Sequence, residues 1–393
     1  MTLLYISYWR AADPLTPSTV VTHLTIAAEL PEVEKIILVT MEAPGQPVPV
    51  LSIPKTIHVP LYSTTTGIST LNQVLGFVRH PKQLAQLARK HGADLLLAKG
   101  VLAGALAMKA SERCNVPFMV ESFEPHADYM AESNEWRKGG LKYLFLRRWE
   151  RLQMKKARHL FTVSNNYKTF LQDHYAVAQV DTLPCCVDVK VFQFSEPLRK
   201  TFRQRLKIAD DEVVGIYAGK FGGIYYDQEA YRVFAMAAKH FLRFRLIVLT
   251  PELPDKLLPS LLAAGLKHEQ IDIRFVPHAE MPGWLSAADF AFATIKPAKS
   301  RKYCCPVKDG EYWASGLPIL LTDGVGDDYL LLQQTHSGAI FDLEEANLVK
   351  GFATIENILR DANHRQRIHE VAVRYRSYAI TRQLYARWLK PQV

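Results

Sequence analysis

One segment in the second half of the chain combines a helix opening with a carboxylate. Pro306 precedes a predicted helix over Lys308–Ser315, and Glu311 lies in its first turns. Gly316 and Pro318 end this helix, since glycine accepts a left-handed C′ position and proline prevents the helix from resuming. The N–H groups at a helix opening bind phosphate. A nearby carboxylate suits the vicinal hydroxyls of a ribose. The segment therefore predicts a site for a nucleotide-sugar.

A strand that ends in a glycine-rich turn is the second segment whose residues could take part in binding or catalysis. Its candidate residues are Gly219, Lys220, Gly222 and Gly223. Glycines let the backbone approach a ligand closely, and the lysine adds a mobile cation. The spacing matches neither a Walker A loop nor a GxGxxG motif, so an ordinary tight turn is an equal alternative. Lys308 opens a helix whose dipole disfavours a cation, which indicates either a nearby anion or a side chain in solvent.

Short apolar runs alternate with helical patterns and must position these two segments. The runs are Leu3–Ser7, Ile36–Val39, Leu95–Ala98, Phe118–Ser122, Leu160–Val163, Val213–Tyr217, Arg245–Leu249, Ile273–Val276, Phe290–Ala293, Ile319–Thr322 and Ala339–Phe341. Continuous apolar runs indicate strands covered on both faces, as in parallel doubly wound sheets. With 393 residues, two domains are expected. We predict an α/β protein with two facing Rossmann-like domains, 1–188 and 189–375, and a C-terminal helix (376–393) that crosses back to the first.

Ligands of open α/β sheets bind beyond the carboxyl ends of the strands, so we expect the site in the cleft between the two domains. Three further groups of residues follow predicted strands. They are His126, in the loop after Phe118–Ser122; Thr16 and Ser18, in the loop after the first strand; and Val276, Pro277 and His278, whose backbone would pair with the edge of a base.

Composition places the chain among globular proteins that work in the cytoplasm. It is 48% hydrophobic and 22% charged. The chain has no apolar run of the roughly 18–20 residues that a spanning helix needs, and its N-terminus lacks a signal-peptide pattern. The five cysteines include two adjacent pairs, Cys185-Cys186 and Cys304-Cys305, without histidines at ligand spacing. This pattern predicts neither a disulfide framework nor a zinc site, and we interpret these residues as small and buried.

Most of the net charge of +9 lies in residues 136–158, which hold nine basic residues and one acid, Glu150. Apolar residues recur within this segment at helical spacing, namely Leu141, Phe145, Trp149 and Leu152. The apolar stripe either packs on the sheet with the charges in solvent, or binds an anionic membrane, such as the inner face of the plasma membrane. Nucleic acid is the least favoured partner because no binding module is recognisable.

The segment Pro306-x-Lys-x-x-Glu-Tyr-x-Ala-x-Gly-x-Pro318 resembles the signature of family 4 glycosyltransferases, which have the two-domain GT-B fold. Other segments resemble family patterns in the expected order. These are Val120–His126 (the active-site histidine), Ala157–Ser164, Thr182–Asp188 (the linker), Tyr217–Gly223 (the phosphate loop) and Met281–Asp289. The resemblance spans about residues 117–345. It departs from the family at Tyr303, where a second acid is usual, at Tyr225, where a second cation is frequent, and at Cys185-Cys186, which replace Asn-Gly.

The resemblance implies a retaining glycosyltransferase that moves a sugar from a nucleotide diphosphate to an acceptor hydroxyl, in cell-surface polysaccharide or glycolipid synthesis. Glu311 would hold the ribose and His126 would position the sugar. The donor set would comprise Gly219, Lys220, Gly222, Gly223, Val276, Pro277, His278, Tyr303, Lys308, Asp309, Gly310 and Glu311. The resemblance implies no metal and no cofactor. The alternatives are a sugar-nucleotide epimerase or hydrolase of the same fold, and a non-catalytic nucleotide-sugar-binding relative.

Overall fold

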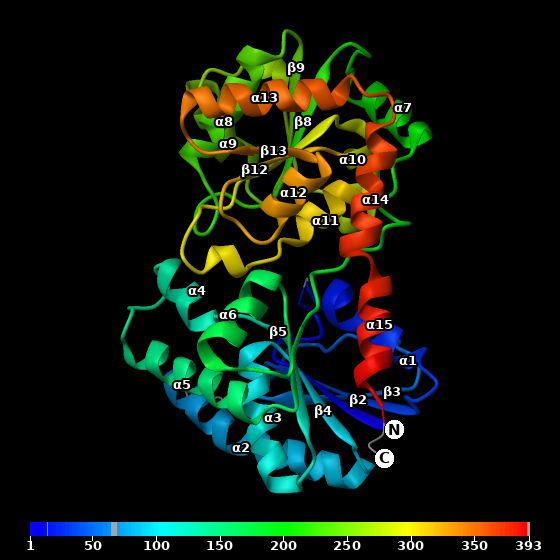
Figure 1. Cartoon of the computed structure of the whole chain (residues 1–393), viewed down its shortest axis with the longest axis vertical. Helices are drawn as coiled ribbons and strands as arrows, with labels where there is room; N and C mark the ends of the chain where they lie inside the picture. Colours follow the sequence, from blue (N-terminus) through cyan, green and yellow to red (C-terminus); the bar gives the residue numbers. More distant parts are fainter. Residues whose placement is uncertain (14, 64–68, 391–393) are drawn as a thin grey trace. The chain divides into compact units, whose positions relative to one another are not determined.

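The computed structural model describes residues 1–13, 15–63 and 69–390, with the side chains of 18 and 69–75 outside this description (Figure 1). The chain forms two compact units. The first comprises Met1–Pro184 with Ala379–Val393, and the second comprises Cys185–Tyr378. The chain thus passes between units after Pro184 and after Tyr378, where the sequence-based division used residues 188 and 375.

The first unit is built on a seven-stranded parallel sheet of order β3-β2-β1-β4-β5-β6-β7. Its strands are β1 (Thr2–Ser7), β2 (Lys35–Glu42), β3 (Thr56–Tyr62), β4 (Leu95–Lys99), β5 (Phe118–Phe123), β6 (His159–Thr162) and β7 (Val180–Thr182). Its helices are η1 (Pro17–Val21), α1 (Thr22–Ala28), α2 (Ser69–His91), α3 (Gly100–Cys114), α4 (His126–Glu132), α5 (Leu141–Lys156), α6 (Asn165–Tyr175) and α15 (Tyr378–Trp388). The sequence prediction missed the two edge strands. β3 is only partly buried and β7 has three residues, so neither shows a continuous apolar run.

The second unit is built on a six-stranded parallel sheet of order β10-β9-β8-β11-β12-β13. Its strands are β8 (Val213–Ala218), β9 (Phe244–Leu249), β10 (Ile271–Arg274), β11 (Phe290–Ala293), β12 (Ile319–Thr322) and β13 (Gly338–Phe341). Its helices are α7 (Glu196–Arg205), α8 (Gln228–His240), α9 (Pro254–Ala263), α10 (Met281–Ala287), α11 (Val307–Ala314), α12 (Asp328–Thr335), α13 (Glu345–Leu359) and α14 (His364–Arg376), with short 3₁₀ turns η2 (His268–Gln270), η3 (His278–Glu280) and η4 (Arg301–Tyr303). All six strands were predicted, with β10 beginning two residues earlier than expected.

Both faces of the second sheet are covered, which explains why its central strands β8, β11 and β12 are almost continuously apolar. Along β11, Phe290 and Phe292 belong to one apolar core with residues of α8, α9 and α13, whereas Ala291 and Ala293 belong to a second core with residues of α10, α11, α12 and α14. Figure 1 shows these two helical layers around the sheet. The α/β class with two Rossmann-like sheets is therefore confirmed.

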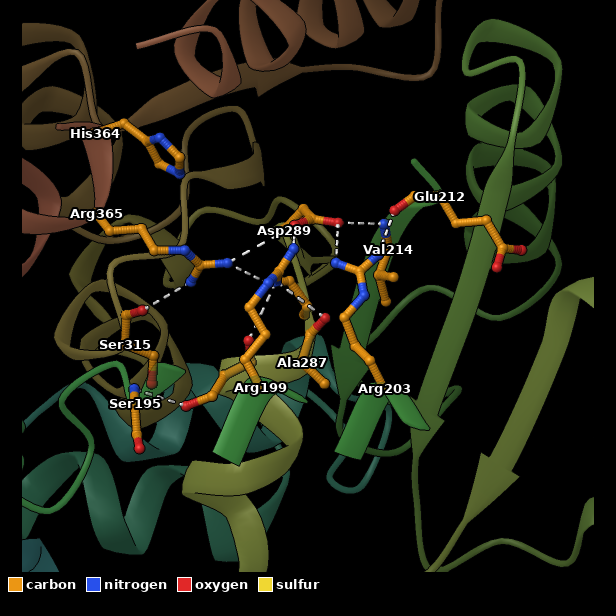
Figure 2. Close-up of polar contacts among 12 residues, drawn as sticks. Ser195, Arg199, Arg203, Glu212, Val214, Ala287, Asp289, Ser315, His364 and Arg365 are labelled. Atoms are coloured by element: carbon orange, nitrogen blue, oxygen red, sulfur yellow. Dashed lines mark hydrogen bonds and ion pairs between the residues drawn. The ribbon is translucent and has the colours of Figure 1, made fainter. Parts of the chain in front are cut away.

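The amino edge of the second sheet is closed by three arginines that converge on Asp289, the residue before β11 (Figure 2). Arg199 donates to this carboxylate at 2.7 Å, and Arg203 and Arg365 lie 3.5 and 3.8 Å from it. Asp289 also accepts from the N–H of Val214 in β8 at 2.8 Å. Arg199 and Arg365 further donate to carbonyls at the end of α10, where the helix dipole favours cations. A ligand of this unit is therefore expected at the opposite, carboxyl edge.

The C-terminal helix α15 returns to the first unit, as predicted, and is anchored there through a buried carboxylate. The hydroxyls of Tyr385 on α15 and of Tyr5 on β1 both donate to Glu121 on β5. The Lys99 ammonium lies 3.2 Å from this carboxylate and the His23 imidazole 3.4 Å from it. These partners satisfy a charge that has no access to water.

The Glu121 cluster predicts a dependence of stability on pH. Burial opposes the charge, but Lys99 and His23 hold the pKa of Glu121 well below its ordinary value. A depressed carboxyl pKa contributes stability that is present above the unfolded pKa of about 4.5 and is lost as the pH falls toward the folded one. Glu121→Gln should lower the free energy of unfolding at pH 7 by about 3–5 kcal/mol and flatten its decline below pH 4.5.

Urea unfolding at pH 7 and pH 3.5 measures this effect. The matched control is Glu34→Gln, since the Glu34 side chain is 81% exposed and should change stability by no more than about 0.5 kcal/mol. Equal stability of Glu121→Gln and the unsubstituted protein at pH 7 would show that the cluster does not anchor α15.

Candidate functional site

The order of the second sheet reverses between β8 and β11, its two central strands. The helices that follow these strands, α8 and α11, lie on opposite sides of the sheet. Ligands of doubly wound sheets bind at such a switch point. The segments at this point are the glycine-rich turn after β8, the loop after β11 and the opening of α11.

The glycine-rich turn has a fixed and open backbone. Gly222 and Gly223 have φ values of +75° and +60°, in the left-handed region, and a Cβ atom at Gly223 would meet nothing within 4 Å. The Tyr217 hydroxyl donates to the Lys220 carbonyl, and the N–H of Phe221 donates to the Glu252 carboxylate at 2.8 Å. The exposed Lys220 ammonium forms no ion pair with a described residue. It therefore remains available to an anion.

The loop after β11 is bonded to the glycine-rich turn. The N–H of Tyr226 donates to the Thr294 carbonyl at 2.9 Å, and the N–H of Lys296 donates to the Ile224 carbonyl at 2.8 Å. Between these bonds, Tyr225 forms an antiparallel bridge with Ile295. The glycine-rich turn and the loop after β11 are therefore held together by backbone hydrogen bonds.

Helix α11 starts at Val307, one residue earlier than predicted, and ends at Ala314. Gly316 has a φ of +70°, and a Cβ atom there would approach the Arg365 carbonyl oxygen to 2.6 Å, so only glycine fits. The Tyr312 hydroxyl accepts from the N–H of Ala218 at 2.9 Å, which fastens α11 to the end of β8. Within the described residues, nothing accepts from the N–H groups of Val307, Lys308 and Asp309. The helix opening predicted from sequence thus presents unpaired donors at the switch point.

Glu311 lies behind this opening and is only 2% exposed. Its carboxylate is 3.1 Å from the His278 imidazole and 2.7 Å from the Lys308 ammonium. Although burial opposes the charge, the hydrogen bond with His278 and the proximity of Lys308 lower the pKa of Glu311. The residue is therefore a carboxylate at neutral pH.

This contact brings together two groups that the sequence analysis kept apart. The backbone of Val276–His278 was assigned to a base and Lys308 to phosphate. Instead, the His278 and Lys308 side chains both contact Glu311. Periodicity gives no signal for such a contact, because His278 precedes Glu311 by 33 residues.

Three predicted donor residues, Asp309, Gly310 and Tyr303, lie in the interior of the unit. Asp309 is buried beside Asp328 and Arg376, and burial raises its pKa well above the ordinary value, which favours the protonated form. A Cβ atom at Gly310 would lie 3.3 Å from the Arg376 guanidinium. Tyr303 is also buried. The side of α11 that carries Asp309 and Gly310 faces the core, and only their backbone could serve a ligand.

His126 is the first residue of α4 in the other unit, and its ring meets Trp136 edge-on at 6.2 Å. Burial lowers the pKa of His126, which keeps the imidazole neutral at pH 7. The next N–H, of Ala127, donates at 2.8 Å to Glu150 on α5, and Glu150 pairs with Arg147 at 3.0 Å. Sequence reasoning missed this role of Glu150, which was visible only as the single acid in a basic segment.

Of the two predicted acceptor-side residues, the structure describes the side chain of Thr16 only. Thr16 is fully buried, and its hydroxyl donates to the Arg10 carbonyl at 2.7 Å. It therefore shapes its own loop. The side chain of Ser18 lies outside the described part of the chain.

The basic helix α5 buries a different face from the one predicted. Its buried residues are Leu146, Glu150, Gln153 and Met154, whereas Leu141, Leu144 and Phe145 are 89%, 54% and 47% exposed. An adjacent surface groove of about 500 Å³ is lined by Tyr143, Leu144, Arg147, Arg148, Arg151, Leu152 and Lys155. Of the two alternatives for the apolar stripe, packing on the sheet does not hold for Leu141 and Phe145.

The described residues lack two features, a membrane-spanning helix and a cluster of metal-binding side chains. No helix among them combines the length and apolar character needed to cross a bilayer. No group of three or more His, Cys, Asp or Glu side chains in the same part of the chain could hold a metal ion.

Comparison with known proteins gives one family match. Residues 19–186 match the sequence model of the Glycosyl transferase 4-like domain. No curated protein sequence matches the chain.

Solved structures with the same fold cover nearly the whole chain. Sucrose-phosphate synthase from Thermosynechococcus elongatus is 14% identical with a TM-score of 0.74, over 99% of this chain and 98% of that one. Anabaena HepE in complex with UDP is 14% identical with a TM-score of 0.73, over 99% of both chains. WaaG, a glycosyltransferase involved in lipopolysaccharide biosynthesis, is 16% identical with a TM-score of 0.66, over 98% of both chains. At these identities the likeness concerns the fold.

Proposed function

Since the chain contains a glycosyl transferase 4-like domain and has the two-sheet GT-B fold, we propose that it is a glycosyltransferase. It transfers a sugar from a nucleotide diphosphate to an acceptor hydroxyl, with retention at the anomeric carbon. The observation that carries this proposal is the open end of α11 at the switch point of the second sheet, with Glu311 behind it.

The leaving diphosphate is stabilised by positive charge at the switch point. Unpaired N–H groups at the opening of α11 and the exposed Lys220 ammonium supply it. Preorganised donors of this kind stabilise charge that develops in the transition state, which is usually the largest catalytic contribution. Lys308 adds to it, because an ammonium group has three N–H donors and only one is directed at Glu311.

Glu311 holds the ribose. A carboxylate offers about four lone-pair sites, of which Lys308 and His278 use two. The two hydroxyls of a ribose can donate to the remaining sites. His278, which is exposed, would then border the nucleoside.

His126 positions the transferred sugar. Its neutral imidazole can both donate and accept a hydrogen bond to sugar hydroxyls, and Glu150 fixes the helix that carries it. This role rests on the resemblance of Val120–His126 to the family segment with the active-site histidine.

A thermal-shift screen tests the donor class, because a ligand that binds only the folded state raises the melting temperature. UDP, GDP and ADP are compared with their glucose conjugates, in the presence of EDTA. UDP is the first candidate since Anabaena HepE has been solved with UDP and with UDP-glucose. Incubation with donor alone separates transfer from epimerisation or hydrolysis, which need no acceptor. Absence of any shift would contradict the proposal.

We also propose that α5 binds an anionic membrane surface, which would place the enzyme in polysaccharide or glycolipid synthesis at the inner face of the plasma membrane. Leu141, Leu144 and Phe145 are exposed beside Arg148 and Arg151. Apolar side chains next to cations suit the boundary between headgroups and acyl chains. Each cation near such a surface contributes about 1 kcal/mol.

Vesicle flotation with and without phosphatidylglycerol measures this binding. The protein should float with the anionic vesicles only, and Leu141→Ser/Leu144→Ser/Phe145→Ser should reduce the bound fraction at least about tenfold. Leu242→Ser is the matched control, since Leu242 is 100% exposed in the second unit. Equal binding of the triple variant would show that α5 is not the membrane surface.

A further inference from the structure

Two cysteines from distant parts of the chain meet in the second unit. Cys185 is the first residue of this unit, and Cys305 lies directly before Pro306, the N-cap of α11. The N–H of Cys185 donates to the Cys305 sulfur at 3.3 Å, and the two thiols share a hydrogen bond. All five cysteines of the chain are reduced in the structure.

The surroundings hold this pair together at an accessible place. Arg376 donates to the Cys185 carbonyl at 3.0 Å and also to the Pro306 carbonyl, so one guanidinium fixes both stretches of backbone. As residues, Cys185 and Cys305 are partly exposed, whereas their neighbours Cys186 and Cys304 are buried, and the Cys305 thiol itself is buried. A small oxidant can therefore reach Cys185 more easily than the buried thiols around it.

We propose that Cys185 and Cys305 form a reversible disulfide in the presence of a peroxide, and that this bond controls nucleotide binding at α11. The bond would join Cys185, the first residue of the second unit, to Cys305, the residue before the N-cap of α11. The control of nucleotide binding rests on the proposed function, whereas the formation of the disulfide does not.

The chemistry is that of two thiols and one peroxide. The Cys185 thiolate attacks the peroxide, an S–O bond forms, the O–O bond breaks, and the departing hydroxide takes a proton to become water. The Cys305 sulfur then attacks the Cys185 sulfur, its proton passes to the second departing hydroxide, and the S–S bond forms as the S–O bond breaks. The two thiols lose two electrons, the peroxide gains them, and two waters result.

The order of attack follows from the two environments. The hydrogen bond with Cys185, together with burial, raises the pKa of the Cys305 thiol well above its ordinary value, although Arg376 opposes this effect. Because Cys185 is partly exposed and the Cys305 thiol is buried, Cys185 meets the oxidant first. Cys305 then resolves the sulfenic acid.

Bond formation would move the opening of α11. Bonded sulfurs lie about 2.05 Å apart, closer than sulfurs in hydrogen-bond contact. We expect the bond to draw Cys305 toward Cys185 and to strain the hydrogen bond between Arg376 and the carbonyl of Pro306, the next residue. The N–H groups of Val307 and Lys308 follow directly. We expect the oxidised protein to bind UDP about tenfold more weakly, as after the loss of one hydrogen bond to a charged group.

Peptide mapping tests the bond. The protein is treated with hydrogen peroxide, blocked with N-ethylmaleimide and digested with trypsin. We expect residues Thr169–Lys190 and Tyr303–Lys308 to be cross-linked. Each peptide contains two adjacent cysteines, so variants assign the bond. Cys185→Ser and Cys305→Ser should abolish the cross-link, whereas Cys186→Ser and Cys304→Ser should retain it. A cross-link that survives Cys185→Ser or Cys305→Ser, or none in the unsubstituted protein, overturns the proposal.

Calorimetric titration with UDP tests the control of binding. The oxidised protein should bind more weakly than the reduced one, and dithiothreitol should restore the affinity. Cys305→Ser should bind UDP equally before and after peroxide. A cross-linked protein with unchanged UDP affinity overturns the regulatory effect. A reduced protein that does not bind UDP contradicts the proposed function, while the mapped disulfide would still stand.

Discussion

Glu311→Gln should weaken UDP binding about 10- to 100-fold and lower donor turnover at least as much. The Glu311 carboxylate is buried and charged, and two of its lone-pair sites are taken by Lys308 and His278. A neutral amide offers one acceptor atom in place of two. The ribose hydroxyls then lose hydrogen bonds to a charged group, each of which contributes about 1.5–3 kcal/mol. Isothermal titration calorimetry with UDP gives the affinity directly.

The matched control for this experiment is Glu269→Gln. Glu269 belongs to the same unit but is exposed on the turn η2, before β10. We expect its affinity for UDP to be that of the unsubstituted protein. Glu311→Ala should abolish turnover while the protein remains folded. Normal turnover in Glu311→Ala would remove the residue from the site.

Arg376→Leu should produce the largest loss of stability in the second unit. Arg376 is buried and donates to both oxygens of Asp328, at 2.9 and 2.7 Å. It also bonds the carbonyls of Cys185 and Pro306. Its removal leaves a buried carboxylate next to Asp309 without compensation. Breaking a buried pair in this way costs about 3–5 kcal/mol.

Chemical unfolding of Arg376→Leu and Arg374→Leu measures the difference. Arg374 lies on the same helix, is exposed and contacts only the Tyr375 ring, at 5.1 Å, among the interactions that the structure gives it. Its substitution should change the free energy of unfolding by no more than about 0.5–1 kcal/mol. The double variant Arg376→Leu/Asp328→Leu should recover part of the loss, because it removes the uncompensated charge. A loss below about 1 kcal/mol in Arg376→Leu would contradict this account.

The sequence predicted the central strands of the second sheet because they are buried on both faces and read as apolar runs, whereas the edge strand β10 (IDIR) is only partly buried and was placed two residues too late. It predicted Gly316 as the end of α11 for a local reason, since the left-handed position is a property of a few neighbouring residues. The sequence did not predict the edge strands β3 and β7, because β3 is partly exposed and β7 is short, and neither contains a continuous apolar run.

The buried face of α5 could not be read from apolar spacing. Two of its four buried residues are polar, and each forms a hydrogen bond with a residue far along the chain. Glu150 accepts from the N–H of Ala127, and Gln153 donates to the Val101 carbonyl at 3.0 Å. The exposed apolar stripe instead includes Leu141, next to the helix start. Hydrogen bonds to residues distant in the sequence, and not apolar spacing, therefore determine which face of α5 is buried.

The sequence predicted the individual segments of the candidate site but not the side-chain contacts between them. The helix opening, the glycine-rich turn and Glu311 follow from local sequence. The contacts of Glu311 with His278 and of Arg376 with Asp328 join residues 33 and 48 positions apart, and they depend on how the strands order themselves in the sheet. The same holds for Cys185 and Cys305, which were interpreted as small buried residues.

Glycine-selective ¹⁵N labelling with a UDP titration tests the central claim, that the opening of α11 and the glycine-rich turn bind the diphosphate. The resonances of Gly222, Gly223 and Gly310 should move as UDP is added, because their N–H groups lie on or beside the binding backbone. Gly92 in the first unit and Gly265 after α9 serve as references and should remain unchanged. If Gly223 and Gly310 do not move at UDP concentrations that saturate binding, the nucleotide binds elsewhere and the account is wrong.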